Sequence, residues 1–251
     1  MEIGRILGIV SGLTAMLISI FLEGGQVIAY MNLSAFIIIA GGCFGAVLLA
    51  VGGDEIKRAP RLFMVAMSAG NDPDPKMLIK ILMDLTNIVR KEGYKGLESK
   101  LKSIKDPFLR SGIKLVVDGM SEDAISELME YEIQNISKRH KSGAEVFNML
   151  GGYAPTMGII GTVLGLVNML MHMGELGSEG LGHAVAVAFI ATLYGILFAN
   201  SIFLPLGSAL KMKSDKELAY KKAIVKAILL LHAGENPRVL EDKVKSILGI
   251  K

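Results

Sequence analysis

The chain of 251 residues alternates between apolar and charged stretches, and four of the apolar stretches are long enough to cross a lipid membrane. Residues 6–22 and 33–51 each come close to the roughly 20 residues that a spanning helix needs. Residues 149–173 and 182–204 are equally apolar but rich in glycine and alanine. This pattern predicts an all-α integral membrane protein with four transmembrane helices and a large helical cytoplasmic insertion between the second and the third.

Small residues recur at helical spacing in the last two apolar stretches. Gly158, Gly161 and Gly165 fall on one side of a helix. In the fourth stretch alanine, threonine and glycine residues likewise fall on one side. Helices with such a bare side pack closely against one another in membranes. Gly41 and Gly45 predict a smaller contact of the same kind on the second stretch.

Two prolines mark the same end of these glycine-rich stretches. Pro155 stands near the start of the third stretch, and Pro205 closes the fourth. An interior proline removes a backbone hydrogen bond and kinks its helix, so we expect hinges at both positions. Thr162 and Thr192 lie in the same stretches. Their hydroxyl groups either bond back to their own helix or line a pore, and the pattern leaves both interpretations open.

The charged stretch after the second span is predicted to be helical. Asp74 and Asp106 each precede a proline, which is typical of a capped helix start, and Asn236 does the same near the C-terminus. A long helix is expected to begin near Glu122 and to enter the third span without a loop. We expect four parts: residues 1–53 with transmembrane helices 1 and 2, residues 54–146 as a cytoplasmic helical domain, residues 147–206 with transmembrane helices 3 and 4, and residues 207–251 as cytoplasmic C-terminal helices.

The 27 basic residues predict the orientation of the chain in the membrane. Apart from Arg5, sixteen lie between Lys57 and Lys141 and ten between Lys211 and Lys251. Cytoplasmic loops carry the excess of lysine and arginine, so both termini and the insertion should face the cytoplasm of a bacterial inner membrane. These basic residues show no aromatic interleaving, which argues against nucleic-acid binding.

The sequence provides no convincing catalytic or metal-binding constellation. It lacks even a Gly-Lys dipeptide, which excludes a P-loop, and Cys43 is the only cysteine. Within the four apolar stretches and their short connections the only carboxylates are Glu23, Glu175 and Glu179, all in predicted outer loops. An ion pathway normally includes an ionisable residue at membrane depth. If the protein handles ions, another chain must carry that group, and no cofactor is expected.

The segments GGYAPTMGIIGTVLGLV and AVAFIATLYGILFANSIFLPL resemble motility protein A, the MotA/PomA stator subunit of the bacterial flagellar motor, in the MotA/TolQ/ExbB superfamily. The resemblance covers most of the chain and implies that Pro155 and Pro205 couple ion passage to movement, with Thr162 and Thr192 along the ion pathway. NIVRKEGYKGLESKL resembles the rotor-facing segment of that family, which implies that role for Arg90 and Glu98.

The resemblance further implies a pentamer of this chain around two copies of a MotB/PomB-type subunit, whose aspartate binds the ion, and contact with the flagellar rotor switch protein. The function expected is torque generation driven by cation flow, without enzymatic activity. A TolQ/ExbB-type energiser of an outer-membrane system is the alternative, although those relatives have three spans. The ion is sodium or a proton: the Gly161-Thr162 position favours sodium, whereas Ala191 stands where a sodium-type protein can carry threonine.

Overall fold

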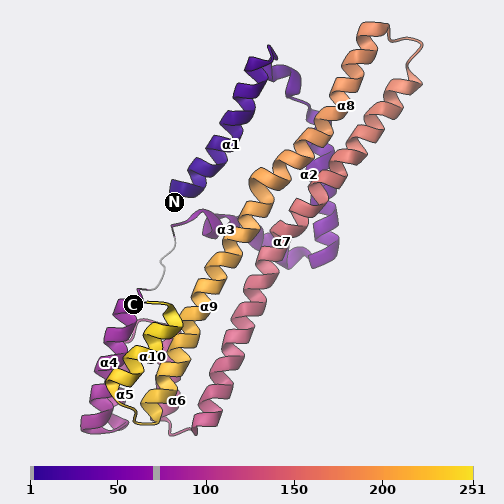
Figure 1. Cartoon of the computed structure of the whole chain (residues 1–251). Helices are drawn as coiled ribbons and strands as arrows, with labels where there is room; N and C mark the ends of the chain where they lie inside the picture. Colours follow the sequence, from indigo (N-terminus) through magenta and orange to yellow (C-terminus); the bar gives the residue numbers. More distant parts are fainter. Residues whose placement is uncertain (1–2, 70–73, 251) are drawn as a thin grey trace. The chain divides into compact units, whose positions relative to one another are not determined.

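The computed structural model describes residues 3–69 and 74–250, and within these ranges the chain is helical with no strand. Figure 1 shows the elements, which follow one another along the chain as α1 (Ile3–Leu22), the short 3-10 turn η1 (Val27–Tyr30), α2 (Leu33–Val51), α3 (Gly53–Met67), α4 (Pro75–Glu92), α5 (Lys95–Leu101), α6 (Pro107–Val117), α7 (Glu122–Met171), α8 (Ser178–Phe198), the π-helical turn η2 (Ala199–Phe203), α9 (Leu204–His232) and α10 (Pro237–Leu248).

Four helical segments are long and apolar enough to cross a membrane, as the sequence predicted. They are Ile3–Leu22, Val27–Val51, Glu122–Met171 and Ser178–His232, each of which holds an apolar window with few charges. Large apolar side chains project outward from them; Leu49, for example, is 90% exposed. A water-exposed surface of this kind would be costly, whereas hydrocarbon accepts it. The prediction of an all-α membrane protein with four spanning helices is confirmed.

The helix starts predicted from Asx-Pro pairs are also confirmed. Asp74 accepts a hydrogen bond from the backbone N–H of Lys76 at 2.9 Å, and Asp106 accepts one from Phe108 at 2.8 Å. Asn236 caps α10 in the same way. In each case the proline occupies the first turn, where its missing N–H would have no helical partner.

Helix α7 continues for 50 residues from Glu122 to Met171, which corresponds to roughly 75 Å at about 1.5 Å per residue. The predicted passage from the charged insertion into the third span without a loop is therefore confirmed. Glu122 and Asp123 in its first turn interact favourably with the positive end of the helix dipole.

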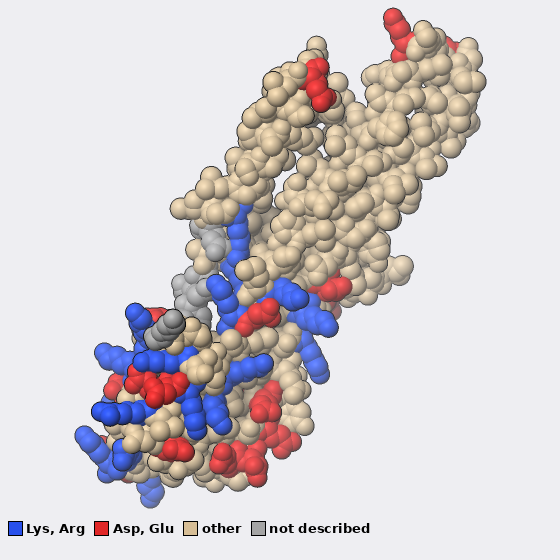
Figure 2. All heavy atoms as spheres, in the orientation of Figure 1, with Lys and Arg blue, Asp and Glu red and all other residues tan. Residues whose placement is uncertain are grey.

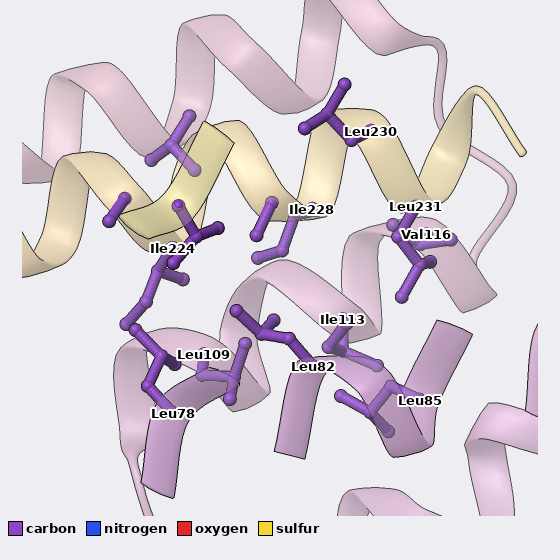
Figure 3. Packing of buried hydrophobic residues seen from close by; sticks show 14 of the residues in the cluster. Leu78, Leu82, Leu85, Leu109, Ile113, Val116, Ile224, Ile228, Leu230 and Leu231 are labelled. Carbon is purple, nitrogen blue, oxygen red and sulfur yellow. The ribbon is translucent and has the colours of Figure 1, made fainter. Parts of the chain in front are cut away.

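The chain divides into two compact units, Met1–Gly70 with Lys141–Lys211 and Asn71–His140 with Met212–Lys251. The second unit joins the insertion helices α4, α5 and α6 to the C-terminal half of α9 and to α10. Figure 3 shows its core, in which leucine and isoleucine side chains of α4, α6 and α9 interdigitate; the labelled members are Leu78, Leu82, Leu85, Leu109, Ile113, Val116, Ile224, Ile228, Leu230 and Leu231. Residues 78–133 of the insertion and 223–244 near the C-terminus, separate in the sequence, thus contribute to one core.

The first unit holds the apolar helices and also α3. Ala66 and Met67 of α3 pack with Phe147 of α7 and Leu206 of α9 in a small buried cluster. In Figure 2 the surface of the apolar helices is almost without charge, while basic and acidic side chains crowd the surface of the second unit. The two units therefore have surfaces suited to different solvents.

The contact expected at Gly41 and Gly45 is not made with any residue in the described part of the chain. An added Cβ at either position would meet nothing within 4 Å. The neighbouring Gly42 faces α7 instead, where a Cβ would lie 2.5 Å from the sulfur of Met157, and Cys43 beside it is buried. Met157 fills the space that Gly42 leaves, so the small-residue contact of α2 is shifted by one residue from the predicted pair.

Candidate functional site

Helices α7 and α8 pack backbone against backbone along their small-residue sides (Figure 1). A Cβ added at Gly158 would lie 2.8 Å from the carbonyl oxygen of Ala191, and one added at Gly165 would lie 2.8 Å from Ala188 Cβ. Real Cβ atoms do not approach so closely, so only glycine fits at these two positions. The predicted close packing of the third and fourth spans is confirmed.

Thr162 of α7 and Thr192 of α8 meet inside this contact. Their Oγ1 atoms lie 2.6 Å apart. Thr162 Oγ1 also lies 3.2 Å from the carbonyl oxygen of Gly158 and 3.0 Å from that of Ala188, while Thr192 Oγ1 lies 3.4 Å from the Gly158 oxygen. Four oxygen atoms from two helices are thus gathered at a half-buried position among apolar side chains.

The hydrogen bonds of this group are limited by its two hydroxyl protons, because each threonine has one donor and two acceptor lone pairs. One proton joins the two hydroxyl oxygens, and the other is donated to a carbonyl of Gly158 or Ala188. Lone pairs remain on the hydroxyl oxygens whichever carbonyl accepts. Oxygen atoms of this kind replace the hydration shell of a cation in selective pores. Thr162 also bonds back to its own i−4 carbonyl, which is the first of the two interpretations of the sequence, and the pore-lining role stays a prediction.

Pro155 lies one turn from this oxygen group, at the tightest point of the helix pair. A Cβ added at Gly195 would stand 3.1 Å from Pro155 Cα and closer still to the carbonyl oxygen of Ala154. Pro155 has no N–H to donate to the carbonyl of Gly151, four residues earlier. The helix nevertheless continues through it.

Pro205 follows a π-helical turn and does not end the helix. The turn, Ala199–Phe203, joins α8 to α9, and Pro205 is the second residue of α9. A proline ring clashes with the carbonyl four residues before it in a regular α-helix, and the wider π turn relieves that clash. Leu204 in turn contacts Gly151, where a Cβ would lie 2.5 Å from Leu204 Cδ2. The residue just before Pro205 therefore contacts the turn of α7 that precedes Pro155.

Arg90 and Glu98 belong to the second unit and take no part in this group. Arg90 lies in the last turn of α4 and Glu98 in the first turn of α5, and both are exposed. Gly93, with a φ of 70°, reverses the chain between the two helices. Among the described residues neither side chain makes an ion pair with the other or with a third group. They therefore present their charges to solvent on neighbouring helices.

The sequence reasoning missed Tyr194, two residues beyond Thr192 on α8. Its hydroxyl donates a hydrogen bond to the backbone oxygen of Tyr30 at 2.6 Å and accepts one from the backbone N–H of Asn32 at 3.2 Å. Asn32 caps α2 through Ala35. Tyr194 thus ties α8 to the connection between the first two spans. The sequence did contain a signal for this contact, namely a single tyrosine in an apolar helix. A tyrosine hydroxyl in such surroundings usually has a hydrogen-bond partner.

Within residues 3–69 and 74–250 no three His, Cys, Asp or Glu side chains are grouped so as to hold a metal ion. The chemistry of the site is therefore that of hydroxyl and carbonyl oxygens held between two closely packed helices, with Pro155 one turn from Gly158.

Comparison with known proteins gives consistent matches along the chain. A family model described as the MotA/TolQ/ExbB proton channel family matches residues 100–223. The chain is 33% identical to motility protein A of Bacillus subtilis (strain 168) over 251 residues, which are 100% of this chain and 92% of that protein. It is 31% identical to chemotaxis protein PomA of Vibrio alginolyticus over 249 residues, which are 99% of this chain and 96% of that protein.

Two solved structures match nearly the whole chain. The structure of C. jejuni MotAB matches with a TM-score of 0.90 and 30% identity, covering 99% of this chain and 96% of the other. The flagellar MotAB stator complex from Bacillus subtilis matches with a TM-score of 0.87 and 33% identity, covering 95% of this chain and 92% of the other.

Proposed function

Because the chain belongs to the MotA/TolQ/ExbB family, and within it to the MotA/PomA subunits of the ion-driven flagellar stator, which are not enzymes, we propose how its own residues divide the work of torque generation. In this proposal the first unit carries the ion pathway and the moving helices. The second unit transmits force to the rotor through its charged surface. One observation supports this division of roles. In the first unit α7 and α8 hold hydroxyl and carbonyl oxygens between apolar side chains, and the apolar membrane stretches of that unit lack carboxylates.

The ion-binding acid comes from a MotB/PomB-type partner. Between residues 6 and 51 and between residues 147 and 204 the only carboxylates are those of Glu23, Glu175 and Glu179. They lie outside the apolar helices or at their ends. A membrane cation pathway normally includes an ionisable group at membrane depth. Both matched structures are named as MotAB assemblies, which supports a second subunit here. Five copies of this chain around the partner's helices form the stator.

Thr162 and Thr192 line the ion pathway in this proposal. Their oxygens and the carbonyls of Gly158 and Ala188 are the polar atoms that α7 and α8 hold between their packed sides. A partly dehydrated sodium ion needs several oxygen ligands, whereas a proton needs only a hydrogen-bonded relay, so we assign sodium as the ion. Pro155 and Pro205 act as hinges in the helices that carry the site, and helix movement at them changes the spacing of these oxygens.

Arg90 and Glu98 contact the rotor switch protein. Their exposure and their lack of ion-pair partners among the described residues leave both charges available to a partner. The insertion and both termini face the cytoplasm, on the inner side of the bacterial inner membrane. The basic residues lie in these parts of the chain, whereas the short outer loops contain no lysine or arginine.

The test is swimming of a strain that lacks its own stator A subunit and carries this chain with its cognate B subunit. Swimming is expected in sodium-containing medium and not in sodium-free medium at constant proton-motive force. Unchanged swimming speed without sodium means that protons drive the motor and removes the sodium assignment. No swimming in any medium, with the protein present in the membrane, contradicts the stator function and favours a TolQ/ExbB-type role.

A further inference from the structure

A groove of about 500 Å³ runs between α7 and α9 within the second unit and is not used by the proposed torque mechanism. Its floor is apolar, from Ile133, Val225 and Leu229. Lys222 and Lys226 of α9 form one wall, and α7 forms the other with the polar residues Ser126, Glu130 and Gln134. The groove is open to solvent, so a side chain from another molecule can enter it.

The lysine wall carries positive charge that the chain does not neutralise. Lys222 and Lys226 are exposed, stand four residues apart on the same face of α9, and make no ion pair among the described residues. Like charges at this spacing repel each other and disfavour the helix. Glu130 on the opposite wall already accepts a hydrogen bond from Ser126 at 3.2 Å. The groove is therefore suited to an apolar side chain accompanied by a carboxylate.

The same chain displays a matching surface on α7, beginning at the edge of the groove. Leu128 and Tyr131 are 47% and 55% exposed, whereas Ile125 and Met129 on the core side of the helix are buried. Glu127 is exposed beside them and makes no ion pair among the described residues. Leu128 lies on a side of α7 away from the groove residues 126, 130, 133 and 134, whereas Glu127 and Tyr131 lie nearer the groove's edge, because Glu127 stands two helical turns before Gln134.

We infer that this surface of α7, made of Glu127, Leu128 and Tyr131, docks into the α7–α9 groove of a second copy of the chain. The apolar side chains cover the groove floor, and Glu127 approaches the lysine wall. The contact joins two different surfaces, so it is heterologous and repeats around a ring rather than closing a two-fold dimer. The inference rests on the self-association in the proposed function and places one of its contacts outside the membrane helices.

Disulfide crosslinking of the full chain in membranes tests the contact. In a Cys43→Ala background, the double variant Tyr131→Cys/Lys226→Cys should form a ladder of linked oligomers after mild oxidation, because every copy supplies both partners. Each single variant should remain monomeric on a non-reducing gel, because a heterologous contact brings residue 131 to residue 226 and not to itself. Coexpressed single variants should stop at the dimer.

The matched control is Tyr131→Cys/Lys243→Cys, which keeps two exposed cysteines in the second unit but moves one to α10. It should give no ladder. A ladder from this control equal to that of the test pair, or dimers from a single variant, overturns the inference. Absence of a ladder from the test pair also overturns it, whereas swimming of the same cells reports separately on the stator function.

Charge reversal gives a second measurement that does not depend on oxidation. Lys226→Glu should lower the crosslinking yield between cysteines at residues 131 and 229 several-fold at low salt. Adding Glu127→Lys to the same chain should restore the yield, because attraction returns with the signs exchanged. A yield unchanged by Lys226→Glu, or not restored by the second reversal, contradicts the placement of Glu127 against the lysine wall.

Discussion

Gly195 of α8 lies against Pro155 of α7 so closely that a Cβ added at Gly195 would stand 3.1 Å from Pro155 Cα. Next to this contact, Gly151 of α7 meets Leu204, the residue before Pro205. Pro155 therefore lies where α7 and α8 approach backbone to backbone, while the residue before Pro205 fills the space that Gly151 leaves. A change of helix angle at either proline should alter the spacing of α7 and α8, which links the prolines to the threonine pair, two turns from Pro155 on α7.

Gly158→Ala should weaken the α7–α8 contact because its Cβ would lie 2.8 Å from the backbone oxygen of Ala191, which cannot move aside cheaply. We expect a loss of about 1–3 kcal/mol in the free energy of unfolding, as for an overpacked core. Thermal unfolding in detergent measures it. Gly152→Ala is the matched control, since its Cβ would meet nothing within 4 Å on the same helix and should change stability by less than about 1 kcal/mol. Equal effects of the two substitutions contradict the close packing.

Thr162→Val and Thr192→Val should show a coupling of about 1 kcal/mol in a double-mutant cycle, because either single change removes the 2.6 Å hydroxyl–hydroxyl bond. The double variant should therefore lose less stability than the sum of the two single variants. Additivity within about 0.3 kcal/mol means that the bond contributes nothing to stability. Thr156→Val serves as the control, since among residues 3–69 and 74–250 its hydroxyl bonds to the carbonyl of Tyr153 on its own helix and to no other helix.

Pro205→Leu should leave assembly intact but abolish torque. Leucine supplies the missing N–H and removes the ring, so the π turn before it is no longer required and the helix becomes stiffer at this point. The measurements are membrane insertion, oligomer size and swimming speed. Full motility of the variant is incompatible with a hinge at Pro205.

Acidification should destabilise the second unit through His140. Its Nδ1 lies 3.1 Å from Ser214 Oγ across α7 and α9. Burial lowers the pKa of His140 below its ordinary value of 6.5; Glu217 opposes that shift, while Arg139 and Lys221 add to it. A lowered pKa means that the folded state favours the neutral ring. The stabilising contribution is therefore complete above pH 6.5 and is lost as the pH falls through the folded pKa.

The check is the thermal midpoint of the full chain between about pH 8 and about pH 5.5, the range over which histidine titrates. The midpoint should fall on acidification, and His140→Gln should reduce that fall because glutamine does not titrate. An equal fall in the variant assigns the pH dependence to other groups.

Neutralising Arg90 or Glu98 singly should reduce motility only slightly, since exposed charges contribute about 0–1 kcal/mol each. Reversing Arg90 to Glu should impair rotation more strongly, because attraction to the rotor becomes repulsion. A charge reversal on the rotor switch protein should then restore part of the swimming speed. If no rotor reversal rescues the variant, Arg90 does not face the rotor.

The sequence alone determined the features that depend on neighbouring residues. Apolar length specified the four spans, and Asp74, Asp106 and Asn236 specified helix starts, because backbone N–H groups are satisfied locally and a spanning helix satisfies its own backbone. The glycine spacing of α7 and the small residues of α8 likewise predicted that these two helices approach closely, since a missing side chain is visible in the residue type itself.

Only the tertiary structure decided which surfaces meet. It placed Leu240 and Val244 of α10 in the core of the insertion, and it chose Gly42 over the predicted pair on α2. It also joined Thr162 to Thr192 and introduced the π turn that carries the helix past Pro205. Hydrophobic burial has no direction, so an apolar face does not specify its partner. That choice depends on how side chains far apart in the sequence fit together once all helices pack at once.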